Sequence, residues 1–328
     1  MALGALLLPL GLSAGACSGG LTDSPIQNTT TTTPEVFVVE GRPLRLRSGR
    51  LHRARSRRGH SHITDRYALW LAPDVRAALA DHWRDQAELE HASVVAFHDL
   101  ARRLEVVDAP DHLIRGALHA AEQEADHAGR CFDLAARYLG VSLRPGRLRR
   151  PRRLPRPRTT ELANLAVEAL RDGVVNEGYA AWLATARIAT TTDHIVRATL
   201  EVIAHDEQHH ADLSAAVLAW CLAEGGAPVH AAVHAAAHAL PDRMVACVVP
   251  AGLDRKALAS HGYSDPDPDG SAYRTIRDAA VAALSTTVST TLSEPATDRR
   301  TTGRQTRPTR HPQQGTGRTA TPCAAQPA

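Results

Sequence analysis

The stretch LIRGALHAAEQEADHAGRCFDLAARY, residues 113–138, decides the fold that this sequence predicts. Core-type residues recur in it at alternating spacings of four and three, the pattern of one helix face. The members of this stripe are Leu113, Ala117, Ala120, Glu124, His127, Cys131, Leu134 and Tyr138. A glutamate and a histidine one helical turn apart therefore lie in the middle of a face that should be apolar.

Three other segments repeat this arrangement. One carries a second glutamate–histidine pair, Glu207 and His210, and the other two carry one glutamate each, Glu90 and Glu177. The three stripes are Val196, Leu200, Ile203, Glu207, His210, Ser214, Val217 and Cys221; Trp83, Ala87, Glu90, Val94, Phe97, Ala101 and Leu104; and Ala166, Leu170, Gly173, Glu177, Ala180, Ala184 and Ile188. The last is the least regular. Each stripe has a carboxylate near its centre.

The spacing predicts four long helices, over about 74–105, 110–139, 160–189 and from 193 to before Gly225. Short connections join the first helix to the second and the third to the fourth, so each pair should be an antiparallel hairpin. The Arg- and Pro-rich stretch 141–159 is long enough to cross the bundle. We therefore expect an all-α, ferritin-like four-helix bundle with a long crossover, and extra C-terminal helices near 227–240 and 271–288.

The core glutamates require compensation. Burying one carboxylate costs several kcal/mol even after relaxation, and four of them repel one another. Protonation or arginine pairing could relieve one or two, whereas two divalent cations neutralise all of them. The i, i+3 spacing turns each glutamate and its histidine to the same side of the helix. The sequence thus predicts a metal site made of Glu90, Glu124, His127, Glu177, Glu207 and His210.

Other polar residues near these positions fall off the stripes. We interpret Glu88, Glu122 and Glu201 as surface or supporting carboxylates, and His91, His205 and His209 as solvated or supporting residues. Asp126 and Asp206 are candidates to orient an imidazole across the bundle. A metal-free bundle, with the stripes assigned to the wrong faces, is the alternative reading of the whole pattern.

Four stretches resemble the ferritin-like superfamily, and in particular bacterial ferritin-like domain proteins with lipoprotein-type signals. They are Glu90-His91-Ala92-Ser93, Glu124-Ala125-Asp126-His127-Ala128, Asn176-Glu177-Gly178 and Asp206-Glu207-Gln208-His209-His210-Ala211. The resemblance covers about 75–225. It implies that Glu124 and Glu207 bridge two metals, that Glu90 and Glu177 are terminal ligands, and that the cations are two iron ions, with manganese as the alternative.

A carboxylate-rich di-iron site predicts redox chemistry with O2 or peroxide, because such sites hold Fe(II) with open positions. An oxidase, a peroxidase and a hydroxylase all fit, with an electron donor that the sequence does not name. The alternatives are a metal-binding or storage bundle without turnover, and a metal-free structural lipoprotein. The sequence does not indicate the oligomeric state.

The N-terminus predicts export to the cell envelope. Residues 2–12 form an apolar run of signal-peptide length, followed by small residues ahead of Cys17. We expect residues 1–17 to be a lipoprotein signal peptide, with Cys17 lipidated and attached to the membrane. Two features of that pattern are missing, since no Lys or Arg precedes the run and Ala14, not Leu, stands three residues before Cys17.

The segments outside the bundle are basic and poor in apolar residues. Residues 18–60 contain eight arginines between Arg42 and Arg58 and predict a disordered linker, and 291–328 predict a disordered tail. Residues 61–290 are then the bundle domain. The net charge is only +3. Because no aromatic stacking residues or recognition motif accompany the arginines, we do not expect nucleic-acid binding.

Overall fold

The structure is a computed structural model that describes residues 42–45, 50–62, 68–148, 150, 155–245 and 247–293. This part of the chain is mostly helical, which confirms the all-α class. The expected signal peptide with Cys17, and residues 294–328 of the expected tail, lie outside the described residues.

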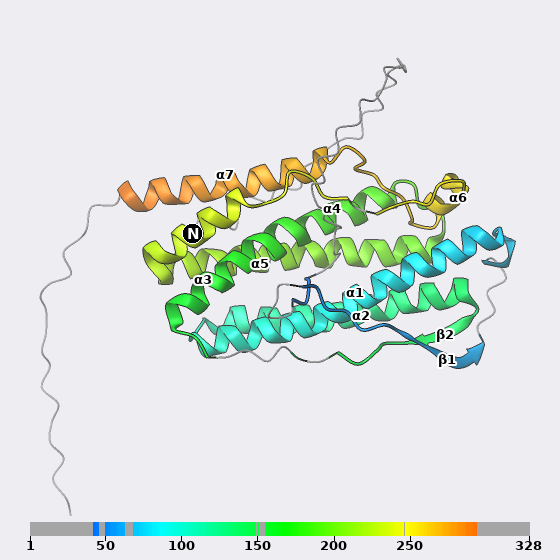
Figure 1. Cartoon of the computed structure of the whole chain (residues 1–328), viewed down its shortest axis with the longest axis horizontal. Coiled ribbons are helices and arrows are strands. Elements are labelled where there is room, and N and C mark those ends of the chain that lie inside the picture. Colours follow the sequence, from blue (N-terminus) through cyan, green and yellow to red (C-terminus); the bar gives the residue numbers. More distant parts are fainter. Residues whose placement is uncertain are drawn as a thin grey trace, which may run out of the picture.

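The first hairpin consists of α1 (Pro73–Val106) and α2 (Asp111–Leu139), which lie side by side and antiparallel (Figure 1). Pro73 begins α1 because proline has no N–H to leave unsatisfied in the first turn. Gly140 ends α2 in the left-handed conformation, at φ 78°, which only glycine adopts without strain. Asp108 has φ 57° in the turn between the helices and does not cap α2.

The second hairpin pairs a composite helix with α5 (His194–His238). The composite helix consists of α3 (Arg158–Glu168), a π-helical segment η2 (Ala169–Val175) and α4 (Asn176–Ile188). Asp193 begins α5, because its side chain accepts hydrogen bonds from the N–H groups of Ile195 and Val196. The expected single helix over 160–189 is thus continuous but has a wider turn in its middle.

The described part of the connection between the two hairpins runs from the end of α2 back along the outside of α1 and α2 (Figure 1). It begins with β2 (Val141–Arg144), which pairs antiparallel with β1 (Arg57–His62). Arg57 faces Arg144 and His62 faces Val141. The prediction of a disordered linker through residue 60 is therefore wrong for residues 57–60, whose backbone finds partners in the crossover.

The linker prediction also fails at residues 42–45. Arg42 and Leu44 are 4% and 3% exposed, and Leu44 accepts a hydrogen bond from the N–H of His52. The low average apolar content of the linker did not reveal this segment, because only a few of its side chains enter the core.

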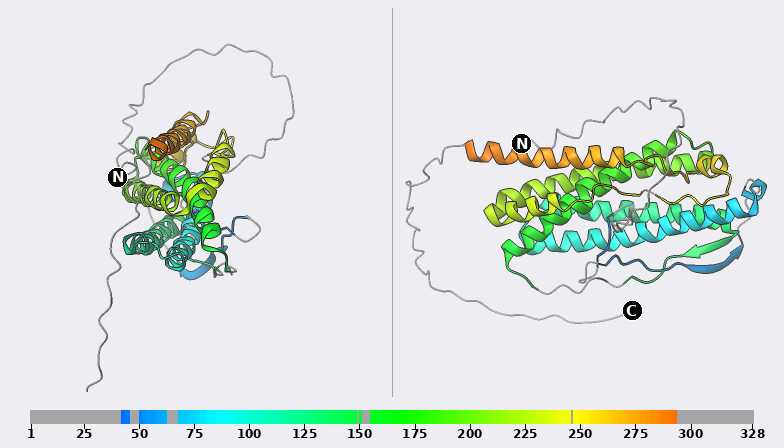
Figure 2. Two further views of the ribbon diagram at one scale, coloured as in Figure 1. Left: turned by 90° about the vertical axis from the view of Figure 1, so that its left-hand side faces the viewer. Right: turned by 45° about the horizontal axis from the view of Figure 1, so that its top comes forward.

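The helix α5 bends at Gly226, where φ is 61° and ψ is −157°, and continues past Pro228 to His238. The sequence predicted that the fourth helix ends before Gly225 and that a separate helix covers 227–240. In the structure a single kinked helix covers both stretches. The helices α6 (Arg255–Ser260) and α7 (Ser271–Ser293) follow, and α7 lies over the second hairpin (Figure 2). By length and composition α5 is apolar enough to span a membrane, and 33% of its most apolar window is buried in the described structure.

Two apolar clusters fill the bundle, one toward each end. The first joins the C-terminal half of α1 and the N-terminal half of α2 to α3, η2 and the later part of α5, with Phe97, Leu165 and Val217 among its members. The second joins the opposite halves of α1 and α2 to the start of α5, with Trp83 and Leu200 among its members. The polar residues singled out in the sequence lie between the two clusters along the helices.

Candidate metal centre

All six of the metal-ligand candidates are buried, and none is more than 1% exposed. They come from α1, α2, α4 and α5. Their ligand atoms form two groups, within each of which the atoms lie within 4.8 Å of one another. One group is Glu90, Glu124, His127 and Glu207, and the other is Glu124, Glu177 and His210. The structure therefore brings together in one place the residues that the stripes picked out on separate helices.

Glu124 and Glu207 both reach toward the two histidines. In Glu124, Oε2 lies 3.8 Å from His127 Nδ1 and Oε1 lies 3.5 Å from His210 Nδ1. In Glu207, Oε1 lies 3.9 Å from His127 Nδ1 and Oε2 lies 3.6 Å from His210 Nδ1. Each of these carboxylates thus turns one oxygen to each half of the cluster, as a carboxylate that bridges two cations does.

The Nε2 atom of each histidine hydrogen-bonds to the residue that directly precedes Glu207 or Glu124 in the sequence. His127 Nε2 lies 3.1 Å from Asp206 Oδ2, and His210 Nε2 lies 3.1 Å from Gln123 Oε1. Gln123 Nε2 also donates to Asp206 Oδ1 at 2.7 Å. Since both partners of the imidazoles are acceptors, each Nε2 carries the proton and each Nδ1 presents a lone pair to the cluster.

Several inward-facing atoms lack a hydrogen-bond partner. These atoms are His127 Nδ1, His210 Nδ1 and Glu177 Oε1, and all of them are buried. A buried acceptor without a partner costs about 1–3 kcal/mol, and unpartnered acceptors that converge on one space are what a cation relieves. These unpartnered atoms therefore support a metal site independently of the sequence pattern.

Without metal, the cluster disfavours its own charges. Burial, and then the charges of Glu90 and Glu207, raise the pKa of Glu124 well above its usual value. Burial likewise raises the pKa of Glu177 to about 7, although the charge of Arg42 opposes this shift. Four buried glutamates this close together cannot all ionise without a large cost in free energy, whereas two divalent cations balance four carboxylates.

The pKa values of the two histidines shift in opposite directions, although burial acts to lower both. Burial lowers the pKa of His210 to about 4. Burial also acts to lower the pKa of His127, but the hydrogen bond to Asp206 and the nearby carboxylates raise it overall. The same hydrogen bond is the main reason why the pKa of Asp206 is depressed. The prediction that an aspartate orients an imidazole is thus confirmed for Asp206, while Asp126 pairs with Arg130 instead, Arg130 Nε lying 2.6 Å from Asp126 Oδ2.

The sequence did not indicate Arg42. Its Nη1 donates to Ser214 Oγ at 3.4 Å, and Ser214 Oγ donates to Glu177 Oε2 at 3.2 Å. Its backbone carbonyl accepts from Ser93 Oγ at 2.9 Å, and its guanidinium lies over the ring of Phe97. Ser214 on an otherwise apolar stripe was the one available sign that a polar group reaches the core there.

The π-helical turn η2 ends two residues before Glu177. At Gly173 in this turn, a Cβ atom would lie 2.2 Å from the Cβ and Oγ of Ser214, so only glycine allows η2 to approach α5 this closely. Such wide turns occur frequently at functional sites. The irregular stripe of the third helix was the sequence signal of this turn.

The off-stripe carboxylates and histidines lie outside the cluster. Glu88 is buried but accepts hydrogen bonds from the N–H and hydroxyl of Ser56. His91 Nε2 lies 3.1 Å from the carbonyl oxygen of Gly146. Glu122 and Glu201 are exposed. His205 and His209 form a further group of possible ligands with Asp206, at the surface of α5.

Comparisons with known proteins identify no relative from which ligands or a function could be transferred to this site. No protein-family model matches the chain, and no curated protein or solved structure matches it either.

Proposed function

We propose that the buried cluster binds two divalent metal ions, iron in the first place and manganese as the alternative. We further propose that the protein uses them in redox chemistry with O2 or peroxide. The observation that carries the proposal is the placement of Glu124 and Glu207, each of which turns one oxygen toward each histidine. A carboxylate shared in this way is suited to two cations rather than one.

In this proposal the residues divide into two half-sites. Glu90 and His127 would hold one ion, Glu177 and His210 would hold the other, and Glu124 belongs to both groups. Glu207 would serve both ions, since its two oxygens face the two histidines. Mixed carboxylate and imidazole donors favour iron or manganese over calcium or magnesium, which prefer oxygen ligands alone. The repeated hairpin, with a crossover between the copies, supports a ferritin-like topology.

Bound iron would supply electron transfer to O2 or peroxide. The protein residues prepare the site for that chemistry. Gln123 and Asp206 orient the imidazoles, and Arg42 places a positive charge behind Glu177. Each ion would be held by one terminal carboxylate, one imidazole and the shared carboxylates. Because octahedral ions accept more donors than these, positions would remain for the oxidant.

The metal content of the purified full chain tests the proposal. We expect about two metal ions per chain in the wild type and almost none in Glu124→Ala/Glu207→Ala. The matched control is Glu122→Ala/Glu201→Ala, which removes exposed carboxylates from the same two helices, α2 and α5, and should keep its metal. Equal metal in wild type and Glu124→Ala/Glu207→Ala would disprove the site.

Turnover separates the redox function from its rivals. With ascorbate as reductant, the iron-loaded protein should consume O2 or hydrogen peroxide steadily. A single stoichiometric uptake of oxidant would instead indicate storage or binding without turnover. Wild-type protein that binds no metal would indicate a structural bundle. Export and membrane attachment through Cys17 stay predictions, since that residue lies outside the described part of the chain.

A further inference from the structure

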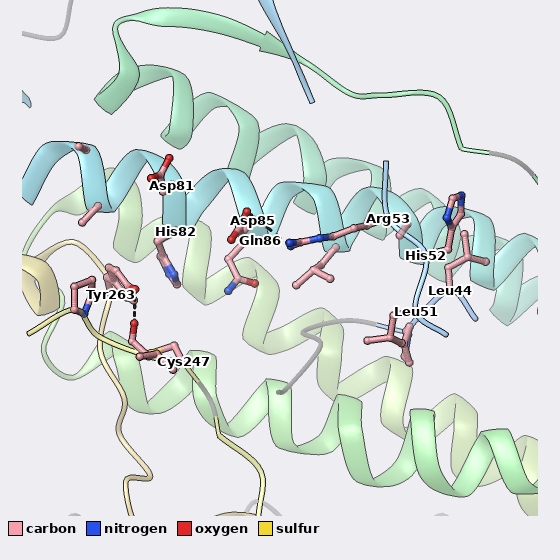
Figure 3. Close-up of a pocket in the computed structure, with 17 residues that line it drawn as sticks. Leu44, Leu51, His52, Arg53, Asp81, His82, Asp85, Gln86, Cys247 and Tyr263 are labelled. Carbon is pink, nitrogen blue, oxygen red and sulfur yellow. Dashed lines mark hydrogen bonds and ion pairs between the residues drawn. The ribbon is translucent and has the colours of Figure 1, made fainter. Parts of the chain in front are cut away.

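A pocket of about 770 Å³ lies along α1, next to the turn that carries Glu90 (Figure 3). Its walls come from α1, from residues 43–44 and 51–53, and from residues 247–250 and Tyr263. Pockets that hold small organic ligands have volumes of roughly 300–1,000 Å³. The space is therefore large enough for an organic molecule.

Two buried polar atoms in this pocket have no partner. His82 Nε2 and Gln86 Oε1 make no hydrogen bond, and their residues are only 7% and 8% exposed. Both side chains point from α1 into the pocket (Figure 3). The ring of His82 stacks on that of Tyr263, with the centroids 4.1 Å apart, and this contact fixes its direction. Unsatisfied buried polar groups are costly, so a ligand that pairs with them gains their hydrogen bonds.

The rest of the lining is mainly apolar. Leu51 and Val248 are among the large apolar residues that remain exposed, at 47% and 61%, and both line this pocket. The other apolar lining residues include Pro43, Leu44, Leu89, Ala92 and Pro250. Apolar side chains left open beside buried polar groups are typical of a ligand site.

The pocket offers little net charge to a ligand. Arg53 and Asp85 in its lining pair with each other at 3.7 Å, and Asp81, also in the lining, pairs with Arg84 at 2.8 Å. His82 is uncharged at neutral pH, because burial lowers its pKa well below the usual value, and the charge of Arg187 lowers it further. Gln86 is neutral. The groups that would contact a ligand are therefore neutral hydrogen-bonding groups and hydrocarbon.

The pocket lies next to the candidate metal centre along α1, and none of the six ligand candidates is in its lining. Gln86 stands one helical turn before Glu90, and Leu89 directly precedes it. One turn of an α-helix rises about 5.4 Å, so a molecule held at Gln86 lies about one helical turn along α1 from Glu90.

We propose that this pocket binds the organic substrate of the metal centre, an uncharged and mainly apolar molecule that carries one hydroxyl group. That hydroxyl donates to Gln86 Oε1 and accepts from the N–H at His82 Nε2, and the apolar body lies against Leu44, Leu51 and Val248. The substrate role depends on the proposed metal function, whereas the ligand class depends on the pocket alone.

Binding of 2-naphthol to the metal-loaded full chain tests the ligand class, with naphthalene-2-sulfonate as the anionic comparison. We expect saturable binding of 2-naphthol, and much weaker binding of the sulfonate. Gln86→Leu should weaken binding of 2-naphthol about tenfold, the value of one lost hydrogen bond of about 1.4 kcal/mol. His82→Phe should weaken it to a similar degree while keeping the ring that stacks on Tyr263.

Matched variants separate the pocket from general effects. Ala78→Trp fills the pocket and should abolish binding, whereas Ala216→Trp, at an exposed position of α5, should not change it. His234→Phe, also exposed on α5, is the control for His82→Phe. No saturable binding, or equal binding by wild type, Gln86→Leu and Ala78→Trp, would overturn the proposal.

Paramagnetic broadening tests the position of the ligand relative to the metal. The proton resonances of bound 2-naphthol should broaden in protein loaded with Mn²⁺ and stay sharp in protein loaded with Zn²⁺. Binding without broadening in chains that contain Mn²⁺ would overturn the substrate role. If the wild-type chain takes up no metal, the proposed function fails, and the titrations with Gln86→Leu and Ala78→Trp still decide the ligand class.

Discussion

The two halves of the candidate metal centre share one ligand pattern but differ in the groups behind it. The imidazole of His127 is held by a carboxylate, Asp206, whereas that of His210 is held by the neutral amide of Gln123. A carboxylate partner makes an imidazole the more basic ligand. We infer that the half-site of His127 is the stronger metal-binding half.

The carboxylates of the two halves also have different surroundings. Glu177 follows the π-helical turn η2 and accepts a hydrogen bond from Ser214, which in turn accepts one from Arg42. Glu90 stands within the regular helix α1. A repeated motif thus produces two inequivalent positions, because the residues around the ligands come from different parts of the chain.

The largest expected effect is that of removing both metals. Bound metal favours the folded state by about 4 kcal/mol when its concentration is a thousand times its dissociation constant. For a bundle of this size, chelation should then lower the melting temperature by roughly 8–16 °C. Differential scanning calorimetry with and without chelator measures this, and an unchanged transition would contradict a buried metal site.

The next largest effect is expected on metal affinity when the hydrogen-bond partner of either histidine is replaced. Asp206→Asn should weaken metal binding at the His127 half by roughly 10–100-fold, and Gln123→Leu should weaken the other half by less. Competition with a chromophoric chelator gives the two affinities. Asp126→Asn is the control, since this exposed aspartate pairs only with Arg130 among the interactions described. Equal losses from Asp206→Asn and Gln123→Leu would remove the inferred difference.

A smaller effect is expected on stability when one glycine in each hairpin is replaced by alanine. Gly173→Ala should destabilise the protein by about 1–3 kcal/mol, because its Cβ would overlap Ser214. Gly129→Ala, on α2, meets nothing within 4 Å and should stabilise the protein by about 0.5–1 kcal/mol. Urea unfolding measures both changes. A stabilised Gly173→Ala would show that η2 does not need its close approach to α5.

The smallest effect concerns pH and the metal-free protein. The pKa of Glu177 is raised to about 7, and those of Glu124 and His127 are also raised. A group with a raised folded-state pKa contributes stability that is lost as pH rises through that value. Unfolding free energy should therefore fall by at least about 1 kcal/mol between roughly pH 6.5 and 8.5.

His210 does not oppose this loss, because its pKa of about 4 leaves it neutral in this range, as it also is in the unfolded chain. Its own contribution is lost only as pH falls below the unfolded value of about 6.5. Urea unfolding of chelated protein across pH measures the dependence. The same slope in metal-loaded protein would show that the cluster is not its source.

Sequence periodicity alone located the candidate ligands. Each of the six residues falls on a stripe spaced by threes and fours, and each is buried in the structure. This succeeds because the face of a helix is a local property that 3.6 residues per turn determine. The lengths of the connections likewise predicted which helices form hairpins.

Only the tertiary structure decided what surrounds those ligands. The pairing of Asp206 with His127, rather than of Asp126 with any imidazole, depends on how far one helix is shifted and rotated against another. No local period contains that information. The sequence did not predict the position of Arg42 for another reason. The average composition of its basic segment is that of a linker, even though one of its side chains enters the core. The pocket at His82 and Gln86 likewise needs walls from distant segments, which only the folded chain brings together.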